Sequence, residues 1–259
     1  MSDLSFGMRG PEVGNLQRFL NTTFFVPNLA VDEDFGNKTR VATAAFQSHE
    51  RIPLAAGQAP EKAGVFGPLT RKRAMEMGFI PFIPARNYTM VPAGAGMNRR
   101  TIDLVVVHTM EAVDKPDTAE RVAAWFAGPD APKASAHYCL DSDSTIQQVR
   151  DRDVAWHAKG ANHNGIGIEH SGYARQTAKD WKSASNQAML TRSAQLVARL
   201  CKEYNIPIER RTADDLKSKM RGICGHVDVT NAFSKGVGHW DPGVSYPWQD
   251  YLALIKANS

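Results

Sequence analysis

The chain has 259 residues, of which 42% are hydrophobic and 22% are charged. This length and composition fit one large or two ordinary globular domains with a sizeable core. The formal net charge of +4 suits an anionic partner but is too small to indicate nucleic-acid binding. Three cysteines without a CxxC pair argue against a disulfide framework and against a cysteine-based zinc site.

The amino terminus has neither the basic segment nor the apolar core of a secretory signal, so no signal peptide is expected. No stretch of the chain is apolar enough to cross a bilayer, so we expect no integral membrane association. These features predict synthesis in the cytoplasm. Something else must then release the protein if it acts outside that compartment.

Residues 1–78 are predicted to form short helices separated by glycine turns. Helices are expected to begin at Pro11, near Asn37 and at Pro68, since proline is favoured in the first helical turn and apolar residues follow with helical spacing. Two of these starts share an aromatic residue, a glycine and a later threonine, 31 residues apart: Phe35-Gly36-Asn37-Lys38-Thr39 and Phe66-Gly67-Pro68-Leu69-Thr70. The shared threonine favours an internal repeat over coincidence.

Three motifs follow one another in this first part: Gly10-Pro11-Glu12-Val13 with Leu16-Gln17-Arg18-Phe19-Leu20, then Val31–Thr39 leading to Ala44-Ala45-Phe46-Gln47, then Gly64–Thr70. Their order and spacing resemble the peptidoglycan-binding helical module found on many cell-wall hydrolases. The resemblance implies a three-helix module in residues 1–78 that binds peptidoglycan, with an insertion expected in residues 51–63.

Residues 79–99 hold three prolines and two glycines, and this composition predicts a linker. The stretch also contains apolar residues, so part of it is expected to pack on a domain.

Residues 100–259 alternate between strand and helix patterns, which predicts an α/β domain with one mixed sheet flanked by helices. Strands are expected at 102–108, 137–140, 145–149 and 165–169, and helices at 118–127, 186–204 and 248–257.

Two histidines and one aspartate in this domain are candidate metal ligands. His108 ends a β-branched run, His226 follows a glycine, and Asp241 precedes the turn residues Pro242-Gly243. Two imidazoles and a carboxylate suit a catalytic Zn²⁺ with one position open for water. No compact HExxH-type signature is present, so spacing alone leaves ordinary surface or core histidines an equally good interpretation.

Five motifs follow one another in residues 100–250: Val105-Val106-Val107-His108-Thr109, Ser135-Ala136-His137-Tyr138, Trp156-His157-Ala158-Lys159-Gly160 with Asn162–Glu169, Gly225-His226-Val227-Asp228, and His239-Trp240-Asp241-Pro242-Gly243 with Pro247-Trp248. In this order they resemble the type 2 family of zinc-dependent N-acetylmuramoyl-L-alanine amidases, which includes the peptidoglycan recognition proteins. Together with the N-terminal module, this resemblance indicates a modular phage endolysin.

The resemblance implies a role for each matching residue. It makes His108, His226 and Asp241 the ligands of Zn²⁺. It makes Glu169 the acid/base, able to deprotonate the attacking water and then protonate the leaving nitrogen. It makes His239 the group that stabilises the oxyanion.

Other polar residues of the motifs receive weaker assignments. Some family members carry a catalytic tyrosine where this chain has Ala136, so that role is not carried over. His137 is expected to orient a strand or a ligand, or to contact substrate together with Trp156 and His157. His170 is expected to lie on the opposite strand face, away from the chemistry.

The implied activity is zinc-dependent hydrolysis of the amide between N-acetylmuramic acid and L-alanine, which lyses the bacterial wall. A monomer made in the host cytoplasm would reach the wall or periplasm after membrane permeabilisation. Three alternatives remain at this point: a non-catalytic peptidoglycan-recognition protein, a cytosolic amidase that recycles muropeptides, and a peptidase that cuts within the stem peptide.

Overall fold

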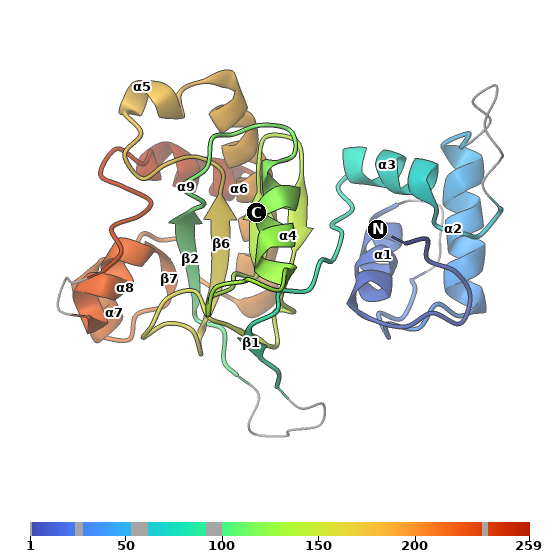
Figure 1. Ribbon diagram of the computed structural model, residues 1–259, viewed down its shortest axis with the longest axis horizontal. Coiled ribbons are helices and arrows are strands. Elements are labelled where there is room, and N and C mark those ends of the chain that lie inside the picture. The colour runs from blue at the N-terminus through green and yellow to red at the C-terminus, as the bar shows by residue number, and fades with distance from the viewer. Residues whose placement is uncertain (1, 24–27, 53–61, 92–99, 235–237) are drawn as a thin grey trace. The chain divides into compact units, whose positions relative to one another are not determined.

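The computed structural model describes residues 2–23, 28–52, 62–91, 100–234 and 238–259. The chain divides into two compact units, Met1–Phe82 and Ile83–Ser259 (Figure 1). Each unit has its own core. No helix among the described residues is long and apolar enough to span a membrane.

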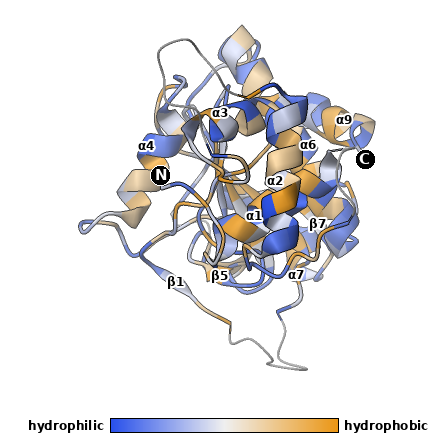
Figure 2. Ribbon diagram, turned by 90° about the vertical axis from the view of Figure 1, so that its right-hand side faces the viewer, coloured by the Kyte–Doolittle hydropathy of each residue, from blue (hydrophilic) through white to orange (hydrophobic). Residues whose placement is uncertain are grey.

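Three helices build the first unit: α1 (Pro11–Thr22), α2 (Asn37–His49) and α3 (Pro68–Glu76). Each begins directly after a glycine, and α1 and α3 have proline in the first turn, as the sequence predicts. The ribbon of α2 carries both hydrophilic and hydrophobic colours, as expected of a helix with one face in a core (Figure 2).

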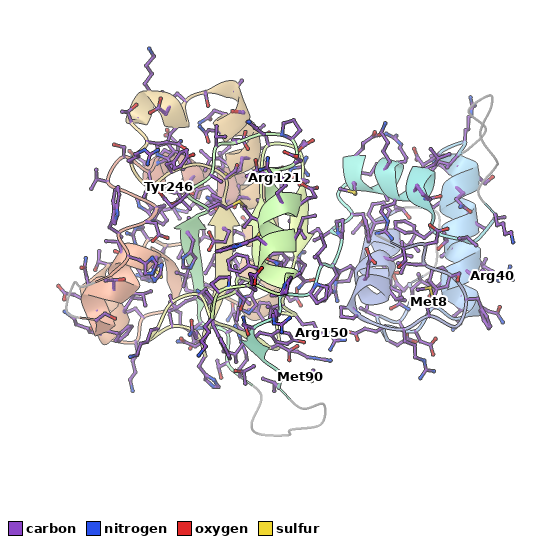
Figure 3. All side chains as sticks on the ribbon, in the orientation of Figure 1. Met8, Arg40, Met90, Arg121, Arg150 and Tyr246 are labelled. Carbon is purple, nitrogen blue, oxygen red and sulfur yellow. The ribbon has the colours of Figure 1, made fainter. Side chains whose placement is uncertain are left out.

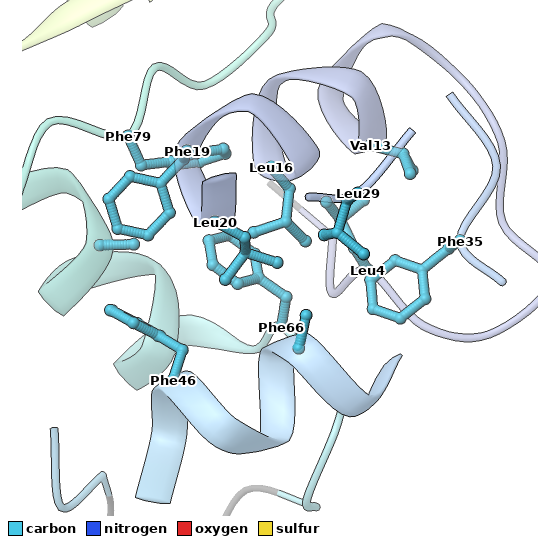
Figure 4. Packing of buried hydrophobic residues seen from close by; sticks show 12 residues of the cluster. Leu4, Val13, Leu16, Phe19, Leu20, Leu29, Phe35, Phe46, Phe66 and Phe79 are labelled. Atoms are coloured by element: carbon cyan, nitrogen blue, oxygen red, sulfur yellow. The ribbon is translucent and has the colours of Figure 1, made fainter. Parts of the chain in front are cut away.

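Aromatic side chains fill the core of this unit (Figure 4). Phe19 meets Phe46 edge to face with ring centroids 5.3 Å apart, and Phe66 meets Phe79 in the same way at 4.9 Å. The two aromatics of the repeat, Phe35 and Phe66, are both fully buried. Such edge-to-face pairs stabilise a small core beyond the burial of their area.

The repeat is also present in the polar interior of the unit. Gln17 donates to Thr39 Oγ1 at 3.1 Å and to the carbonyl of Asp34 at 3.0 Å. In the second copy Gln47 donates to Thr70 Oγ1 at 2.9 Å and to the carbonyl of Val65 at 2.7 Å. In each copy a buried glutamine thus fixes the loop that enters the next helix, which explains why the threonine recurs.

The second unit contains a five-stranded sheet of order β4-β3-β6-β2-β7. Its strands are β2 (Leu104–Thr109), β3 (Tyr138–Leu140), β4 (Thr145–Gln147), β6 (Gly165–His170) and β7 (Gly222–Gly225). Strand β2 runs parallel to both β6 and β7, and β3 runs parallel to β6, whereas β4 is antiparallel at the edge. A separate pair joins β1 (Tyr88–Thr89) to β5 (Val154–Ala155).

Helices flank this sheet, which confirms the predicted α/β architecture. In Figure 1 α6 and α9 lie behind the strands and α4 lies in front of them. The helices are α4 (Thr118–Ala127), α5 (Ala178–Trp181), α6 (Ala184–Tyr204), α7 (Ala213–Lys217), α8 (His226–Phe233) and α9 (Trp248–Ala257). The sequence patterns did not reveal β7, α5, α7 or α8, which are all short.

The stretch predicted as a linker, 79–99, is divided between the units where the structure describes it. Phe79 packs in the core of the first unit. Ala85 packs in a core cluster of the second unit, and β1 follows it. Residues 92–99 of this stretch, and residues 53–61 of the expected insertion, lie outside the described residues.

Among the glycines that the structure describes, Gly243 leaves the least room for a side chain. Its φ is +92°, and a Cβ there would lie 1.8 Å from the carbonyl oxygen of Ala174, a backbone atom. We expect Gly243→Ala to lower the free energy of unfolding of the second unit by about 2–4 kcal/mol. Tryptophan fluorescence during urea unfolding measures this directly, because all five tryptophans belong to the second unit.

Gly128→Ala is the matched control. Gly128 has φ −71°, open to any residue, and its added Cβ would meet its nearest atoms at 3.4 Å. A Gly243→Ala protein as stable as this control would contradict the close packing described for the turn.

Candidate metal centre

The parallel strands bring two distant histidines to one edge of the sheet. His108 lies near the carboxyl end of β2, and Val107 pairs with Gly225, the last residue of β7. His226 therefore follows at the same level, as the first residue of α8. Parallel strands share the edge at which they end, and this is where α/β proteins commonly bind ligands.

Asp241 completes a compact group with these histidines. One ligand atom from each of His108, His226 and Asp241 lies within 4.8 Å of the others, and all three residues are buried. His108 Nδ1 is 3.2 Å from Asp241 Oδ2, and His226 Nδ1 is 3.3 Å from Asp241 Oδ1. The Val227 N–H donates to the Asp241 carbonyl at 2.9 Å, which ties this loop to the first turn of α8.

The ionisation of the group suits a metal. Burial lowers the pKa of His108, which favours the neutral imidazole that metals require. Burial alone would raise the pKa of Asp241, but before a cation binds, hydrogen bonding to His108 and His226 outweighs it and lowers that pKa. A bound cation would take the place of those imidazole protons. Two imidazole nitrogens and one carboxylate oxygen are a ligand set of catalytic zinc sites.

Glu169 lies beside this group. It pairs in register with His108 across β2 and β6, so the two side chains lie on the same face of the sheet. Burial, followed by the negative charges of Asp241 and Glu111, raises the pKa of Glu169 well above its ordinary value. A carboxyl group of raised pKa can hold a proton and return it near neutral pH, as acid/base catalysis requires.

His239 lies at the exposed side of the group. Its ring stacks on His226 with centroids 4.2 Å apart, and its Nδ1 is 3.7 Å from Asp241 Oδ1. The side chain is 71% exposed. His239 therefore borders the candidate metal ligands without itself being buried.

A cleft of about 720 Å³ contains these groups. It is open and lined mainly by apolar surface, which fits a bulky ligand with a few polar contacts. The polar side chains described above all line the cleft: His108, Glu169, His226, His239 and Asp241. The walls of the cleft also include Trp125, Trp156 and Trp240.

One substrate-binding assignment needs correction. His137 is fully buried and is not part of the cleft lining; its Nδ1 accepts from Gly167 N–H at 3.0 Å and its Nε2 faces the Asp153 carbonyl at 3.1 Å. It orients strand β6, the other role expected for it. His157 borders the cleft, but both of its ring nitrogens have protein partners, His108 and the Gly165 carbonyl. His137 therefore cannot contact a substrate in the cleft, whereas the substrate contact expected of His157 stays a prediction.

Trp156 and His170 lie where the sequence analysis expects them. Trp156 lines the cleft and donates through Nε1 to Thr89 Oγ1 at 3.0 Å. His170 points to the opposite face of β6, where it contacts Ser193 Oγ at 2.6 Å and the hydroxyl of Tyr246, labelled in Figure 3, at 3.1 Å.

Three cleft residues were missed from sequence. Trp125 and Trp240 are 55% and 52% exposed although they are large and apolar. No sequence signal separated Trp125 from Phe126, because adjacent apolar residues of a helix can both be buried, as Phe19 and Leu20 are. Glu111 has φ 51°, and its Oε1 accepts from Thr109 Oγ1 and from Ala174 N–H, each at 2.8 Å.

Comparison with known proteins supplies a family. The profile of the N-acetylmuramoyl-L-alanine amidase family matches residues 98–244, more than half of the chain. The N-acetylmuramoyl-L-alanine amidase A of Achromobacter lyticus is 33% identical over 156 residues, which cover 59% of this chain and 82% of that protein.

A solved structure shares the fold. The Staphylococcus aureus hydrolase AmiA, crystallised in complex with its ligand, aligns with a TM-score of 0.50 and 15% sequence identity, covering 84% of this chain and 90% of that one. The extent of the profile match, together with the similarity to the Achromobacter amidase, establishes that this chain is an enzyme of the N-acetylmuramoyl-L-alanine amidase family.

Proposed function

We propose that the protein is a zinc-dependent amidase that cleaves the bond between the lactyl group of N-acetylmuramic acid and L-alanine in peptidoglycan. One observation carries the proposal: the His108, His226 and Asp241 group shares a cleft with Glu169 in a chain of this family. A binding-only protein has no need of a carboxyl group of raised pKa beside three metal-binding side chains.

His108, His226 and Asp241 would hold the zinc ion. Zinc supplies Lewis-acid polarisation of the scissile carbonyl and makes water acidic enough to attack near neutral pH. Glu169 accepts a proton from the attacking water and later delivers it to the leaving nitrogen, so that the alanine departs as a neutral amine. A ring N–H of His239 donates to the oxygen on which negative charge develops.

The shape of the cleft fits the proposed substrate. A muramoyl peptide combines a sugar ring with an extended peptide, and tryptophan walls offer flat apolar surfaces to both. Trp125 comes from α4, Trp156 follows β5, and Trp240 precedes Asp241. They border the cleft that holds the chemistry, so a bound substrate would lie with its amide near Glu169.

We further propose that the first unit binds the wall. Its three helices and its repeated glutamine–threonine contacts form a module with a core of its own, to which the sequence motifs assign peptidoglycan binding. Holding the enzyme on an insoluble polymer raises the effective concentration of its bonds. This arrangement fits a monomeric, bacteriolytic phage endolysin that is made in the host cytoplasm and reaches the wall after the membrane is permeabilised.

Loss of a ligand tests the metal centre. We expect His226→Ala to lose stoichiometric zinc, because two ligands bind zinc far more weakly than three. His163→Ala is the control, since that histidine is exposed and lies outside the cleft lining. Metal analysis of the dialysed proteins gives the answer, and full zinc content in His226→Ala would refute the ligand assignment.

Removal of the acid/base tests the mechanism. We expect Glu169→Gln to retain zinc and fold but to lose activity by about 10²–10⁴-fold, the usual contribution of a positioned acid/base. Mass spectrometry of fragments from purified peptidoglycan measures the rate and also identifies the bond cut. Glu203→Gln, on the exposed surface of α6, is the control. Near-normal turnover in Glu169→Gln would remove this residue from the mechanism, and fragments cut within the stem peptide would identify a peptidase instead.

Separation of the units tests the wall-binding role. Each unit has its own core, so we expect each to fold alone. Residues 1–82 contain the proposed wall-binding module, so we expect them to sediment with insoluble peptidoglycan, whereas residues 83–259 should remain largely in solution. A pull-down with purified walls compares the two fragments. If residues 1–82 stay in the supernatant, the protein would act on soluble muropeptides, as a recycling amidase does.

A further inference from the structure

A second histidine lies directly behind the metal-facing side of His108. The Nε2 of His108 is 3.1 Å from the Nδ1 of His157, and the two rings meet edge to face with centroids 5.2 Å apart. The other nitrogen of His157, Nε2, is 3.2 Å from the carbonyl oxygen of Gly165. The Gly165 carbonyl, His157 and His108 therefore form a continuous chain of hydrogen bonds.

The carbonyl fixes the direction of every proton in this chain. A carbonyl oxygen only accepts, so His157 must carry its proton on Nε2 and donate it to Gly165. His157 Nδ1 lies 3.1 Å from His108 Nε2, and a neutral His157 that already donates from Nε2 has no proton left on Nδ1. Its Nδ1 then bears a lone pair and accepts the Nε2–H of His108.

This hydrogen bond determines which nitrogen of His108 carries the lone pair. A neutral His108 whose proton is on Nε2 has its lone pair on Nδ1, the atom that lies 3.2 Å from Asp241 Oδ2. Metals bind the lone pair of a neutral imidazole, and the hydrogen bond of the other nitrogen sets which tautomer is present. His157 thus selects the form of His108 that can bind a metal beside Asp241.

Two glycines of β6 make room for the ring of His157. A Cβ on Gly167 would lie 2.4 Å from His157 Cγ, and one on Gly165 would lie 3.3 Å from His157 Cε1. Both glycines alternate with the buried Ile166 and Ile168, so they face the same side of the strand. The Gly-Ile-Gly-Ile-Glu motif therefore provides space for an imidazole as well as delivering Glu169.

The backbone at His157 is also fixed. Asn162 Oδ1 accepts the N–H of His157 at 2.9 Å and the N–H of Ala158 at 2.6 Å. This clamp fixes the backbone that carries the ring, and the ring packs against Gly165 and Gly167 of β6. It accounts for Asn162 in the same sequence motif, to which the proposed chemistry assigns no other task.

We propose that His157 is a positioning residue for the metal centre, which holds His108 in the Nε2–H tautomer with Nδ1 directed at the ion. The inference rests on the proposed zinc centre. It replaces the substrate contact expected of His157 by a role in metal affinity.

Zinc affinity of the full-length chain tests this role. The metal-free wild type, His157→Phe and His157→Gln would each compete with a chromophoric chelator for Zn²⁺. Phenylalanine keeps the ring but removes the acceptor, and we expect zinc to bind about 10–100-fold more weakly, the usual cost of losing such a partner. Glutamine can donate to Gly165 and accept from His108, so we expect it to recover most of the affinity.

The outcomes separate the inference from the proposed function. Equal zinc affinity in the wild type and His157→Phe would overturn the positioning role while leaving the zinc centre intact. A wild type that binds no zinc would overturn the zinc centre and this inference together. Equal weakening in both variants would show that His157 acts through packing alone, and would also overturn the inference.

A measurement on the wild type avoids any dependence on how the variants fold. Imidazole ¹⁵N chemical shifts of the zinc-loaded, full-length protein distinguish the two tautomers of His108. We expect the proton of His108 on Nε2 and zinc on Nδ1. A proton on Nδ1 would overturn the inference, whatever the variants do.

Discussion

The parallel register of β2 with β6 and β7 is the constraint on which the site depends. His108 pairs with Glu169, and Val107 pairs with Gly225, so that His226 begins the next helix at the same level. A slip of one residue in β2 would turn His108 to the opposite face of the sheet, away from Glu169 and Asp241. The site therefore depends on backbone hydrogen bonds that align the ends of β2, β6 and β7.

Burial then gives these side chains opposite protonation behaviour. It lowers the pKa of His108 and raises that of Glu169, because in both cases it disfavours the charged form. Asp241 is buried as well, yet its pKa is lowered because two imidazoles contact it. The same low-polarity environment thus provides an ionised carboxylate, that of Asp241, for a cation. On β6 it provides a carboxyl group, that of Glu169, which is able to carry a proton.

Buried polar side chains with fully defined partners recur in both units. Gln17 and Gln47 each fix the loop before a helix by a hydrogen bond to a threonine. His137 and His157 each hydrogen-bond to the backbone of a β6 glycine. A buried polar group is costly unless it is hydrogen-bonded, so such groups admit few arrangements of the surrounding backbone. In this protein they hold loops and strands where apolar packing alone would allow sliding.

Much of this protein is encoded in short stretches of sequence. Helices starting at Pro11 and Pro68, strand β2 and the α/β alternation follow from periodicity and from turn residues, which act between neighbours in the chain. The order of the motifs was also enough to pick out His108, His226 and Asp241, which the fold does bring together. Strand β7 escaped prediction because four residues bounded by glycines show no period.

What the tertiary structure alone decided is which side chains meet across long separations in sequence. His157 lies 49 residues from its partner His108, and its ring nitrogens are directed by the register of β6 and by the Asn162 clamp. Likewise, the choice between Trp125 and Phe126 for the core depended on how α4 packs. Local sequence sets the type of element, whereas the partner of a side chain depends on strand register and on space left by distant glycines, which no local pattern records.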